Sequence, residues 1–242
     1  MGFFTQLFGG KKKTSTGRAT GQEAAPTQAA SKPNGNARRG EFFDALSTEW
    51  DTMTRLNPAQ EQQLAELIDR IGIPEGSVVV DAGCGTGVLY KYLAPRVGSK
   101  GRVFGIDISP KMISLAETKF GHDQRFHWHT ASVERLIEEI APEGIDRIIC
   151  YSSFPHFDDQ KGFLKIAAQA LRPGGKLAII HLGSSDEING LHSDIKDSPV
   201  AQDTLPSIRD LSVMAQDVSL AVQTSQEEPG VYFFLGASLK RP

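Results

Sequence analysis

The sequence predicts an α/β fold: a mostly parallel sheet with helices on both faces and an antiparallel pair of strands at its end. Three observations predict it. Short apolar runs alternate with helical patterns from Val78 onward, which is typical of strand–helix repeats around a parallel sheet. A glycine-rich turn, "DAGCGTGVL", follows the first apolar run. The last two apolar runs are separated only by "SQEEPG", which is too short for a crossover helix and therefore predicts an antiparallel hairpin.

Two helices are expected ahead of this repeat. The segment "EFFDALSTEWDTMTRLNP" spaces its apolar residues as an amphipathic helix does, at Phe42, Phe43, Leu46 and Trp50. Pro58 does not let this helix continue. A second helix is expected to begin with Asn57 as its cap and Pro58 at its first position, and to end at Gly72. Its buried stripe is expected at Leu64, Leu67, Ile68 and Ile71.

The repeat itself contains short runs that are apolar enough for burial on both faces of a sheet. The expected strands are 78–81, 102–107, 125–130, 145–150 and 176–181. The expected helices are 87–97, 110–120, 132–140, 158–171, 185–195 and 206–216.

Charge divides the chain into two unequal parts. The 242 residues carry a net charge of −3, but residues 1–40 hold seven Lys or Arg and one Glu, so the remainder is strongly acidic. The composition from Lys11 to Gly40 lacks bulky apolar residues, which predicts a disordered tail at 1–40 and a single folded domain at 41–242. The acidic domain argues against nucleic acid as the main ligand.

Composition also predicts where the protein works. The two cysteines, Cys84 and Cys150, are too few for a disulfide framework, and no apolar run approaches the length of a membrane span. We therefore expect a cytoplasmic enzyme. Residues 1–13 combine four apolar side chains with a lysine triplet, so weak membrane contact stands as an alternative to a frayed terminus.

The spacing of the glycines limits which class of ligand the turn can bind. A turn of this kind lets backbone N–H groups and a helix N-terminus face a ligand. A dinucleotide fingerprint would need glycine at the position of Val88, and no Gly-Lys-Ser/Thr of a phosphate-binding P-loop follows. The pattern is D-x-G-x-G-x-G, beginning at Asp81.

In this pattern the chain resembles the class I S-adenosylmethionine-dependent methyltransferases. Further segments are similar to the later motifs of that family, in order: "VFGIDISPKMISLA", "HTASVERL", "IDRIICYSSFPHF" and "LRPGGKLAIIH". The resemblance implies a Rossmann-like seven-stranded sheet in the order 3-2-1-4-5-7-6, with strand 7 antiparallel, which agrees with the terminal hairpin. It is closest to the small-molecule branch that includes ubiquinone and menaquinone biosynthesis methyltransferases.

The resemblance also implies how S-adenosyl-L-methionine would be held. Asp81 would take up the ammonium group, Asp107 both ribose hydroxyls, and Ile108 would pack on the adenine. Ser132 and the Val133 backbone stand where the family often has an acidic residue near the adenine amino group. The implied cofactor-binding residues are Asp81, Ala82, Gly83, Cys84, Gly85, Gly87, Asp107, Ile108, Ser132, Val133 and Tyr151. The alternative is that the two acids cap helices and the glycines only allow tight packing.

The catalytic group predicted is His156, in the "FPHF" loop over the expected site. A methyl acceptor that carries a proton needs a base, and imidazole titrates near neutral pH. A packing or hydrogen-bonding histidine is the alternative.

The segment 182–206 is expected to form a lid or substrate wall, because it leaves the carboxyl edge of the sheet. His181 and His192 are its expected substrate-side residues. Their spacing with Asp203 matches no closed metal site, so no metal is predicted, although His181, His192 and Asp203 are the candidates if one binds.

The function these features predict is methyl transfer to a small-molecule acceptor by in-line displacement. Two alternatives stay open. A methyltransferase acting on RNA or protein would hold its substrate with the basic tail. A noncatalytic S-adenosylmethionine-binding protein is the other, although the intact glycine motif with Asp107 counts against it.

Overall fold

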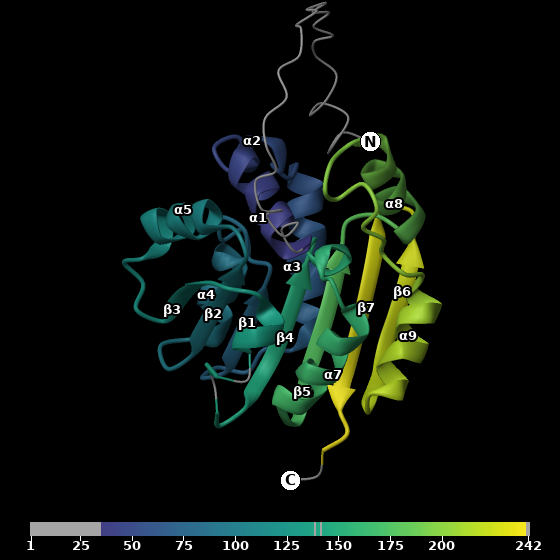
Figure 1. Ribbon diagram of the computed structural model, residues 1–242. Coiled ribbons are helices and arrows are strands. Elements are labelled where there is room, and N and C mark those ends of the chain that lie inside the picture. Colours follow the sequence, from purple (N-terminus) through teal and green to yellow (C-terminus); the bar gives the residue numbers. More distant parts are fainter. Residues whose placement is uncertain (1–34, 138, 141, 241–242) are drawn as a thin grey trace, which may run out of the picture.

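The computed structural model describes residues 35–137, 139–140 and 142–240 (Figure 1). The apolar residues and lysines of segment 1–13 lie outside this part of the chain, so membrane contact and tail disorder stay predictions. Within the described part, no helix is both long enough and apolar enough to span a bilayer.

A single seven-stranded sheet forms the centre of the molecule, in the order β3-β2-β1-β4-β5-β7-β6. Strand β7 pairs antiparallel with both β5 and β6, and the other neighbours pair in parallel. The order and the antiparallel terminal hairpin are confirmed. The strands are β1 (Val78–Ala82), β2 (Arg102–Asp107), β3 (Phe126–Thr130), β4 (Ile145–Tyr151), β5 (Leu171–His181), β6 (Leu220–Glu228) and β7 (Val231–Ser238).

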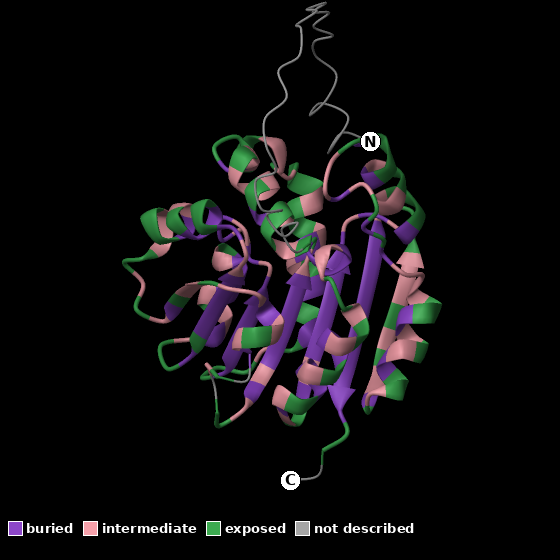
Figure 2. Cartoon of the chain, viewed as in Figure 1, coloured by how far each residue is buried: buried purple, intermediate pink, exposed green. Residues whose placement is uncertain are grey.

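Helices cover both faces of this sheet (Figure 1). Helices α6 (Val133–Leu136), α7 (Gln160–Ala170) and α9 (Ile208–Asp217) share one hydrophobic core with it. Helices α3 (Pro58–Ile71) and α4 (Tyr90–Val97) share the core on the opposite face. Strands β1 and β7 are buried over their whole length, and β4 and β5 over most of it, as the purple in Figure 2 shows. This burial is why these segments are mostly apolar in the sequence.

Helix ends follow the expected capping chemistry. Asn57 and Gln60 form a reciprocal capping box at the start of α3, with Pro58 in its first turn. Gly72 ends that helix in the left-handed conformation, at φ 66°. Helix α5 (Pro110–Phe120), which packs beside β2 and β3, has its predicted bounds.

Several predicted bounds are wrong. Helix α4 begins at Tyr90 and not at 87, because three glycines with positive φ hold residues 83–87 in a turn. Strand β5 begins at Leu171, since Leu171 already pairs with Ile145. Helix α6 is only four residues long.

The folded part also begins earlier than predicted. Helix α1 (Gly35–Leu46) includes Gly35–Gly40, which the sequence assigned to the tail, and α2 (Trp50–Met53) follows after a break. Tertiary contacts account for the difference. Arg39 pairs with Asp203 and Asp158, and a Cβ on Gly40 would lie 3.3 Å from the carbonyl oxygen of Ile108. Composition predicts none of these contacts.

Candidate functional site

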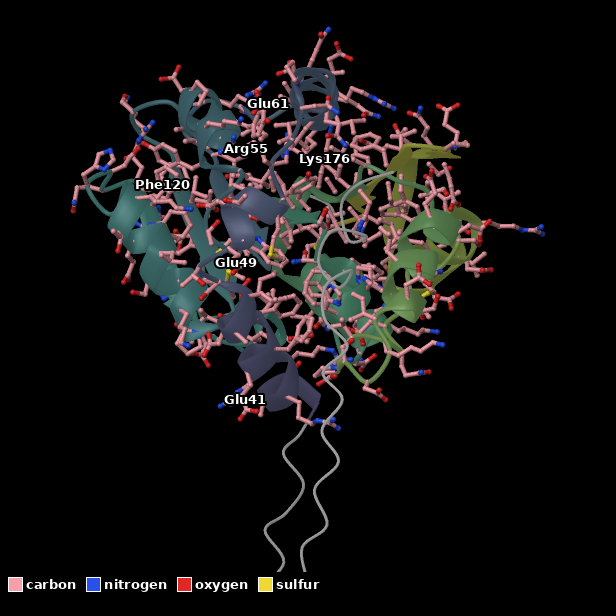
Figure 3. All side chains as sticks on the ribbon, turned by 90° about the horizontal axis from the view of Figure 1, so that it is seen from above. Glu41, Glu49, Arg55, Glu61, Phe120 and Lys176 are labelled. Atoms are coloured by element: carbon pink, nitrogen blue, oxygen red, sulfur yellow. The ribbon has the colours of Figure 1, made fainter. Side chains whose placement is uncertain are left out.

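The predicted site residues meet at one edge of the sheet. Four of them lie at the carboxyl ends of parallel strands: Asp81 on β1, Asp107 on β2, Tyr151 on β4 and His181 on β5. Helices α1 and α2 lie over this edge, as the view from above shows (Figure 3). This is where ligands bind in open α/β folds.

The glycine turn after β1 has a backbone that other residues rarely adopt. Gly83, Gly85 and Gly87 have φ values of 75°, 52° and 85°. A Cβ on Gly83 would also lie only 2.4 Å from the Cβ of Ser153, whose hydroxyl donates to the carbonyl oxygen of Ala82 at 2.6 Å. Packing therefore contributes to the requirement for glycine. At Gly85 a Cβ would meet only the Trp50 indole nitrogen, at 3.5 Å.

Asp107 is held in place by backbone donors. Its Oδ2 accepts from the Gly85 N–H and its Oδ1 from the Ser109 N–H, both at 2.9 Å. Burial raises the pKa of Asp107, and these two hydrogen bonds oppose that effect. The Asp107 carboxylate is thus held beside the glycine turn, where the family resemblance predicts the acceptor of the ribose hydroxyls.

Asp81 is the less stabilised of the two carboxylates. Its side chain is 3% exposed, and burial followed by the charge of Asp107 raises its pKa to about 8. No described residue donates a hydrogen bond to its carboxyl group. A buried acid without a hydrogen-bond donor beside a half-buried acid forms a site that favours a cationic ligand.

Near Ser132, the predicted adenine contact, lies an acid that the sequence interpretation did not assign to the site, Glu134. The Ser132 hydroxyl donates to the carboxylate of Glu134, two residues on. The Ala131 N–H donates to the carbonyl oxygen of Asp107 at 2.9 Å, which ties this loop to the end of β2. Val133 is buried and Ile108 half-buried. The sequence did contain a signal for Glu134: in "TASVERL" this acid follows two residues after Ser132, the position where the family often has its acidic residue.

Helices α1 and α2 contribute residues that the sequence analysis did not assign to the site. Asp44 accepts from the Ser109 hydroxyl at 2.5 Å and from the Lys111 N–H at 3.0 Å, at the start of α5. In α2, Asp51 accepts from the hydroxyl of Thr86 in the glycine turn. The N-terminal helices therefore contact the glycine turn and the segment after β2, where the cofactor-binding residues are predicted.

A cluster of histidines lies on the other side of the strand ends. The rings of His156 and His192 are 5.0 Å apart, and His156 Nδ1 lies 2.8 Å from Oδ2 of Asp203. Burial, together with the charge of His156 and then of His192, lowers the pKa of His181 to about 3. Burial and then His156 lower that of His192 to about 4. Both rings are therefore neutral near pH 7.

His181 has an unusual environment. It is 2% exposed, its Nε2 is buried, and no described residue forms a hydrogen bond with that nitrogen. Its nearest aromatic contact is the ring of Tyr232, with centroids 5.9 Å apart. A buried polar atom without a partner is costly and often marks a site completed by a ligand.

The predicted lid, 182–206, is fastened to the sheet: the Ser185 N–H donates to Glu227 of β6 at 2.8 Å, and the Tyr232 hydroxyl of β7 donates to the carbonyl oxygen of Pro206 at 3.0 Å. Helix α8 (Ser185–Asp194) starts with a capping box of Ser184 and Glu187, and the Asn189 side chain bonds both backbone groups of Leu205. The segment brings His192 and Asp203 to His156. Among the described residues no group of three or more His, Cys, Asp or Glu has the arrangement of a metal site. The candidates His181, His192 and Asp203 are near one another, but Asp203 is engaged by Arg39 and His156.

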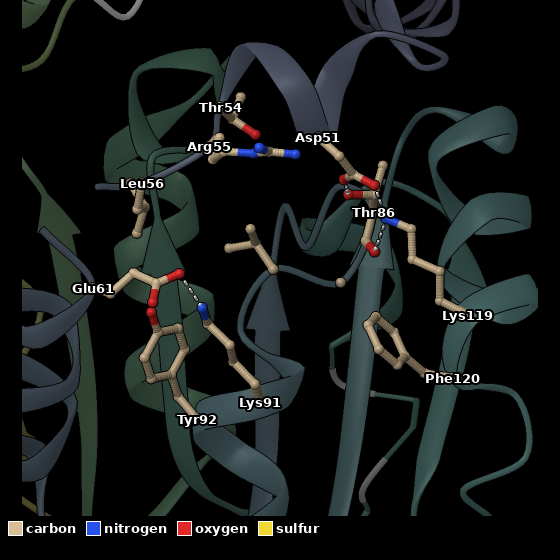
Figure 4. A pocket seen from close by; sticks show the side chains of 12 residues that line it. Asp51, Thr54, Arg55, Leu56, Glu61, Thr86, Lys91, Tyr92, Lys119 and Phe120 are labelled. Carbon is tan, nitrogen blue, oxygen red and sulfur yellow. Dashed lines mark hydrogen bonds and ion pairs between the residues drawn. The ribbon is translucent and has the colours of Figure 1, made fainter. Parts of the chain in front are cut away.

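A separate pocket of about 330 Å³ lies beside the glycine turn, and of the site residues described above only Asp51, Thr86 and Gly87 line it (Figure 4). Its walls come from α2, α3, α4 and α5, and two ion pairs border it, Lys91–Glu61 and Lys119–Asp51. Because it lacks Asp81, Asp107 and His156, we do not assign the cofactor to it.

Comparison with known proteins finds a methyltransferase domain in the part of the chain that contains the glycine turn, Asp107 and His156. Residues 79–175 match the family model described as a methyltransferase domain. The chain is 33% identical over 139 residues to a ubiquinone biosynthesis O-methyltransferase of Aromatoleum aromaticum, covering 56% of this chain and 58% of that protein. It is 30% identical over 113 residues to a 2-phytyl-1,4-naphtoquinone methyltransferase of Thermosynechococcus vestitus, covering 47% and 49%. The chain thus spans about half the length of these relatives.

Solved structures share the fold. A magnesium protoporphyrin IX methyltransferase from Synechocystis PCC 6803, with bound SAM, has a TM-score of 0.57 and 18% identity, covering 88% of this chain and all of that chain. The residues present here fit that cofactor in two respects. S-adenosylmethionine carries an ammonium and a sulfonium, whose positive charges suit the acids Asp81 and Asp107, and Gly85 leaves the turn without a side chain beside them.

Proposed function

We propose that this chain is a class I S-adenosylmethionine-dependent methyltransferase and transfers a methyl group from S-adenosylmethionine to a small-molecule acceptor, because residues 79–175 match a methyltransferase domain. The observation that carries the proposal is the pair of carboxylates flanking the glycine turn, the buried Asp81 and the half-buried Asp107. The quinone-pathway names of the relatives support a small acceptor.

Each part of the site has a proposed role. Asp81 takes the ammonium group, and in doing so exchanges its own proton for a cation. Asp107 is held by the Gly85 and Ser109 N–H groups and accepts the ribose hydroxyls. Ser132 and Glu134 form the adenine end. Tyr151, at the end of β4, lies between the cofactor side and the histidine cluster.

The bound cofactor supplies an electrophilic methyl group on a sulfonium. The acceptor's lone pair forms the new bond to the methyl carbon while the carbon–sulfur bond breaks, and its electron pair stays on sulfur. His156 takes the proton that the acceptor loses, and alignment of the two reactants supplies most of the rate. His181 and His192, both neutral, are proposed to line the acceptor side.

Two measurements test this function. Calorimetry with S-adenosylhomocysteine tests the cofactor site, and we expect micromolar binding by the purified chain. Radiolabelled S-adenosylmethionine with small-metabolite extracts tests transfer, with and without a chelator. Label appearing in a small molecule and unaffected by the chelator supports the proposal. Absence of binding, or label appearing only in RNA or protein, contradicts it.

A further inference from the structure

Three side chains from distant parts of the sequence form one chain of contacts beside the candidate site. Arg39, in α1, donates from Nε to Oδ2 of Asp203 at 2.9 Å and from its terminal nitrogen to Oδ1. The same oxygen, Oδ2 of Asp203, also meets Nδ1 of His156 at 2.8 Å. Arg39 and Asp203 are 164 residues apart, and Asp203 and His156 are 47 apart.

The contacts are shielded from solvent. The side chains of Asp203, Arg39 and His156 are 3%, 13% and 15% exposed. Burial raises the pKa of Asp203, but the hydrogen bonds from His156 and Arg39 outweigh burial and hold the pKa below its usual value. Asp203 is therefore a carboxylate that only accepts hydrogen bonds. The ring nitrogen that faces it must carry a hydrogen.

We propose that Asp203, oriented by Arg39, is a positioning residue that fixes His156 as the tautomer with hydrogen on Nδ1 and a free lone pair on Nε2. The inference rests on the proposed function, in which Nε2 takes the acceptor's proton. In that step the proton moves to Nε2 as the acceptor's bond to the methyl carbon forms, and the resulting imidazolium keeps its Nδ1–H bonded to Asp203. The carboxylate then stabilises the charge that forms next to it.

Arg39 distinguishes the two oxygens of Asp203. Its terminal nitrogen donates to Oδ1, and its Nε is shared between Oδ2 at 2.9 Å and Oδ1 at 3.2 Å. Oδ1 therefore meets only Arg39, whereas Oδ2 meets both Arg39 and His156. Helix α1 therefore contributes to the base although it lies outside the part of the chain that matches the methyltransferase family model, 79–175.

Substituting an amide for the carboxylate separates this inference from a merely structural role. In Asp203→Asn the single oxygen should stay with the donors of Arg39, so the NH₂ group turns toward His156. His156 Nδ1 must then accept, hydrogen moves to Nε2, and the base is lost while the ring stays in place. In a serine protease triad the same change keeps the geometry but selects the wrong tautomer, with a loss of about 10⁴ in kcat.

The experiment measures tautomers by nitrogen NMR on the full chain labelled with ¹⁵N-histidine, at about pH 9, where ordinary imidazoles are neutral. His156→Gln assigns the His156 signals by their absence. We expect Nδ1–H in the wild type and a shift of about tenfold or more toward Nε2–H in Asp203→Asn. Adding Arg39→Met to Asp203→Asn frees the amide to rotate, so the double variant should recover Nδ1–H. Asp217→Asn, an exposed acid paired with Lys161, is the matched control and should change nothing.

Each result decides the inference. A wild-type His156 with hydrogen on Nε2, or a tautomer that Asp203→Asn leaves unchanged in a folded protein, overturns it. If Asp203→Asn does not fold, Asp203→Ala with the same readout replaces it, and loss of the Nδ1–H preference is then expected. Binding of S-adenosylhomocysteine is measured separately on the same samples. Failure to bind it contradicts the proposed function, whereas binding with an unchanged tautomer contradicts only the role of Asp203.

Discussion

Asp81 and Asp107 lie at the carboxyl ends of the neighbouring strands β1 and β2, and the charge of Asp107 adds to burial in raising the pKa of Asp81 to about 8. Near pH 7 the free protein therefore holds a proton on Asp81. An ammonium group bound there favours the ionised form, so its binding must lower this pKa and release the proton.

The first prediction is proton release on cofactor binding. Calorimetry with S-adenosylhomocysteine at about pH 7, in phosphate and in Tris, should give enthalpies that differ by up to one proton's worth of buffer ionisation. Affinity should rise as the pH increases toward 8. Asp81→Asn is the control and should abolish the buffer dependence. Equal wild-type enthalpies in both buffers would show that Asp81 does not meet the ammonium.

The second prediction concerns the ribose. Asp107→Ala removes a charged acceptor of two hydroxyls and also frees the Gly85 and Ser109 N–H groups. We expect S-adenosylhomocysteine affinity to fall about 10- to 100-fold, as expected for hydrogen bonds to a charged group. His156→Ala should change this affinity far less. Similar losses in the two variants would contradict the assignment of Asp107.

The third prediction concerns Glu134, which accepts from the Ser132 hydroxyl. If this acid receives the adenine amino group, Glu134→Gln should weaken S-adenosylhomocysteine binding several-fold, by about 1 kcal/mol. It should leave binding of the deaminated analogue S-inosylhomocysteine unchanged, because that ligand lacks the amino group. Comparing the two ligands in one calorimetric series checks this. Equal weakening of both ligands would indicate an effect on the loop and not on adenine recognition.

The fourth prediction concerns pH and stability. His181 is neutral in the folded protein, with a pKa of about 3, while an unfolded histidine titrates near about 6.5. Unfolding therefore takes up a proton below that pH, and this histidine's contribution to stability is lost as the pH falls from about 6.5 toward 3. Within that window, His181 should lower the free energy of unfolding of the wild type by about 1.4 kcal/mol for each pH unit of acidification.

Urea unfolding at about pH 7 and about pH 5 measures this effect. His181→Phe, which keeps an aromatic ring against Tyr232, removes the titrating group and should show a smaller loss of stability on acidification. His122→Phe, at an exposed position in the turn after α5, should keep the wild-type slope. An unchanged slope in His181→Phe would mean that the ring is not buried as a neutral group.

The sequence predicted the sheet more completely than the site. The terminal hairpin and the capping of α3 follow from local signals: apolar runs, Asn57-Pro58 and Gly72. The strand order followed from the resemblance to the methyltransferase family. The placement of Asp81 and Asp107 followed from the parallel topology, which brings strand ends together. Their ligand roles and that of His156 stay predictions.

Contacts between distant segments explain what the sequence did not predict. The pairing of Arg39 with Asp203 spans 164 residues and has no local pattern, so residues 35–40 of α1 were assigned to the tail from their composition. No role was predicted for Asp44 from the sequence, yet it accepts from the Ser109 hydroxyl and the Lys111 N–H at the start of α5. Asp203 was considered only as a metal ligand, because its hydrogen bond to His156 depends on the fold of the whole segment that follows β5.

Helix α1 is fastened on both sides of the strand ends, by Asp44 to the start of α5 and by Arg39 to Asp203. Helix α1 therefore contacts both the proposed cofactor side and the histidine side of the site. On the proposed function, we expect exchange of the cofactor to require separation of Arg39 from Asp203, so that product release limits turnover at saturating acceptor.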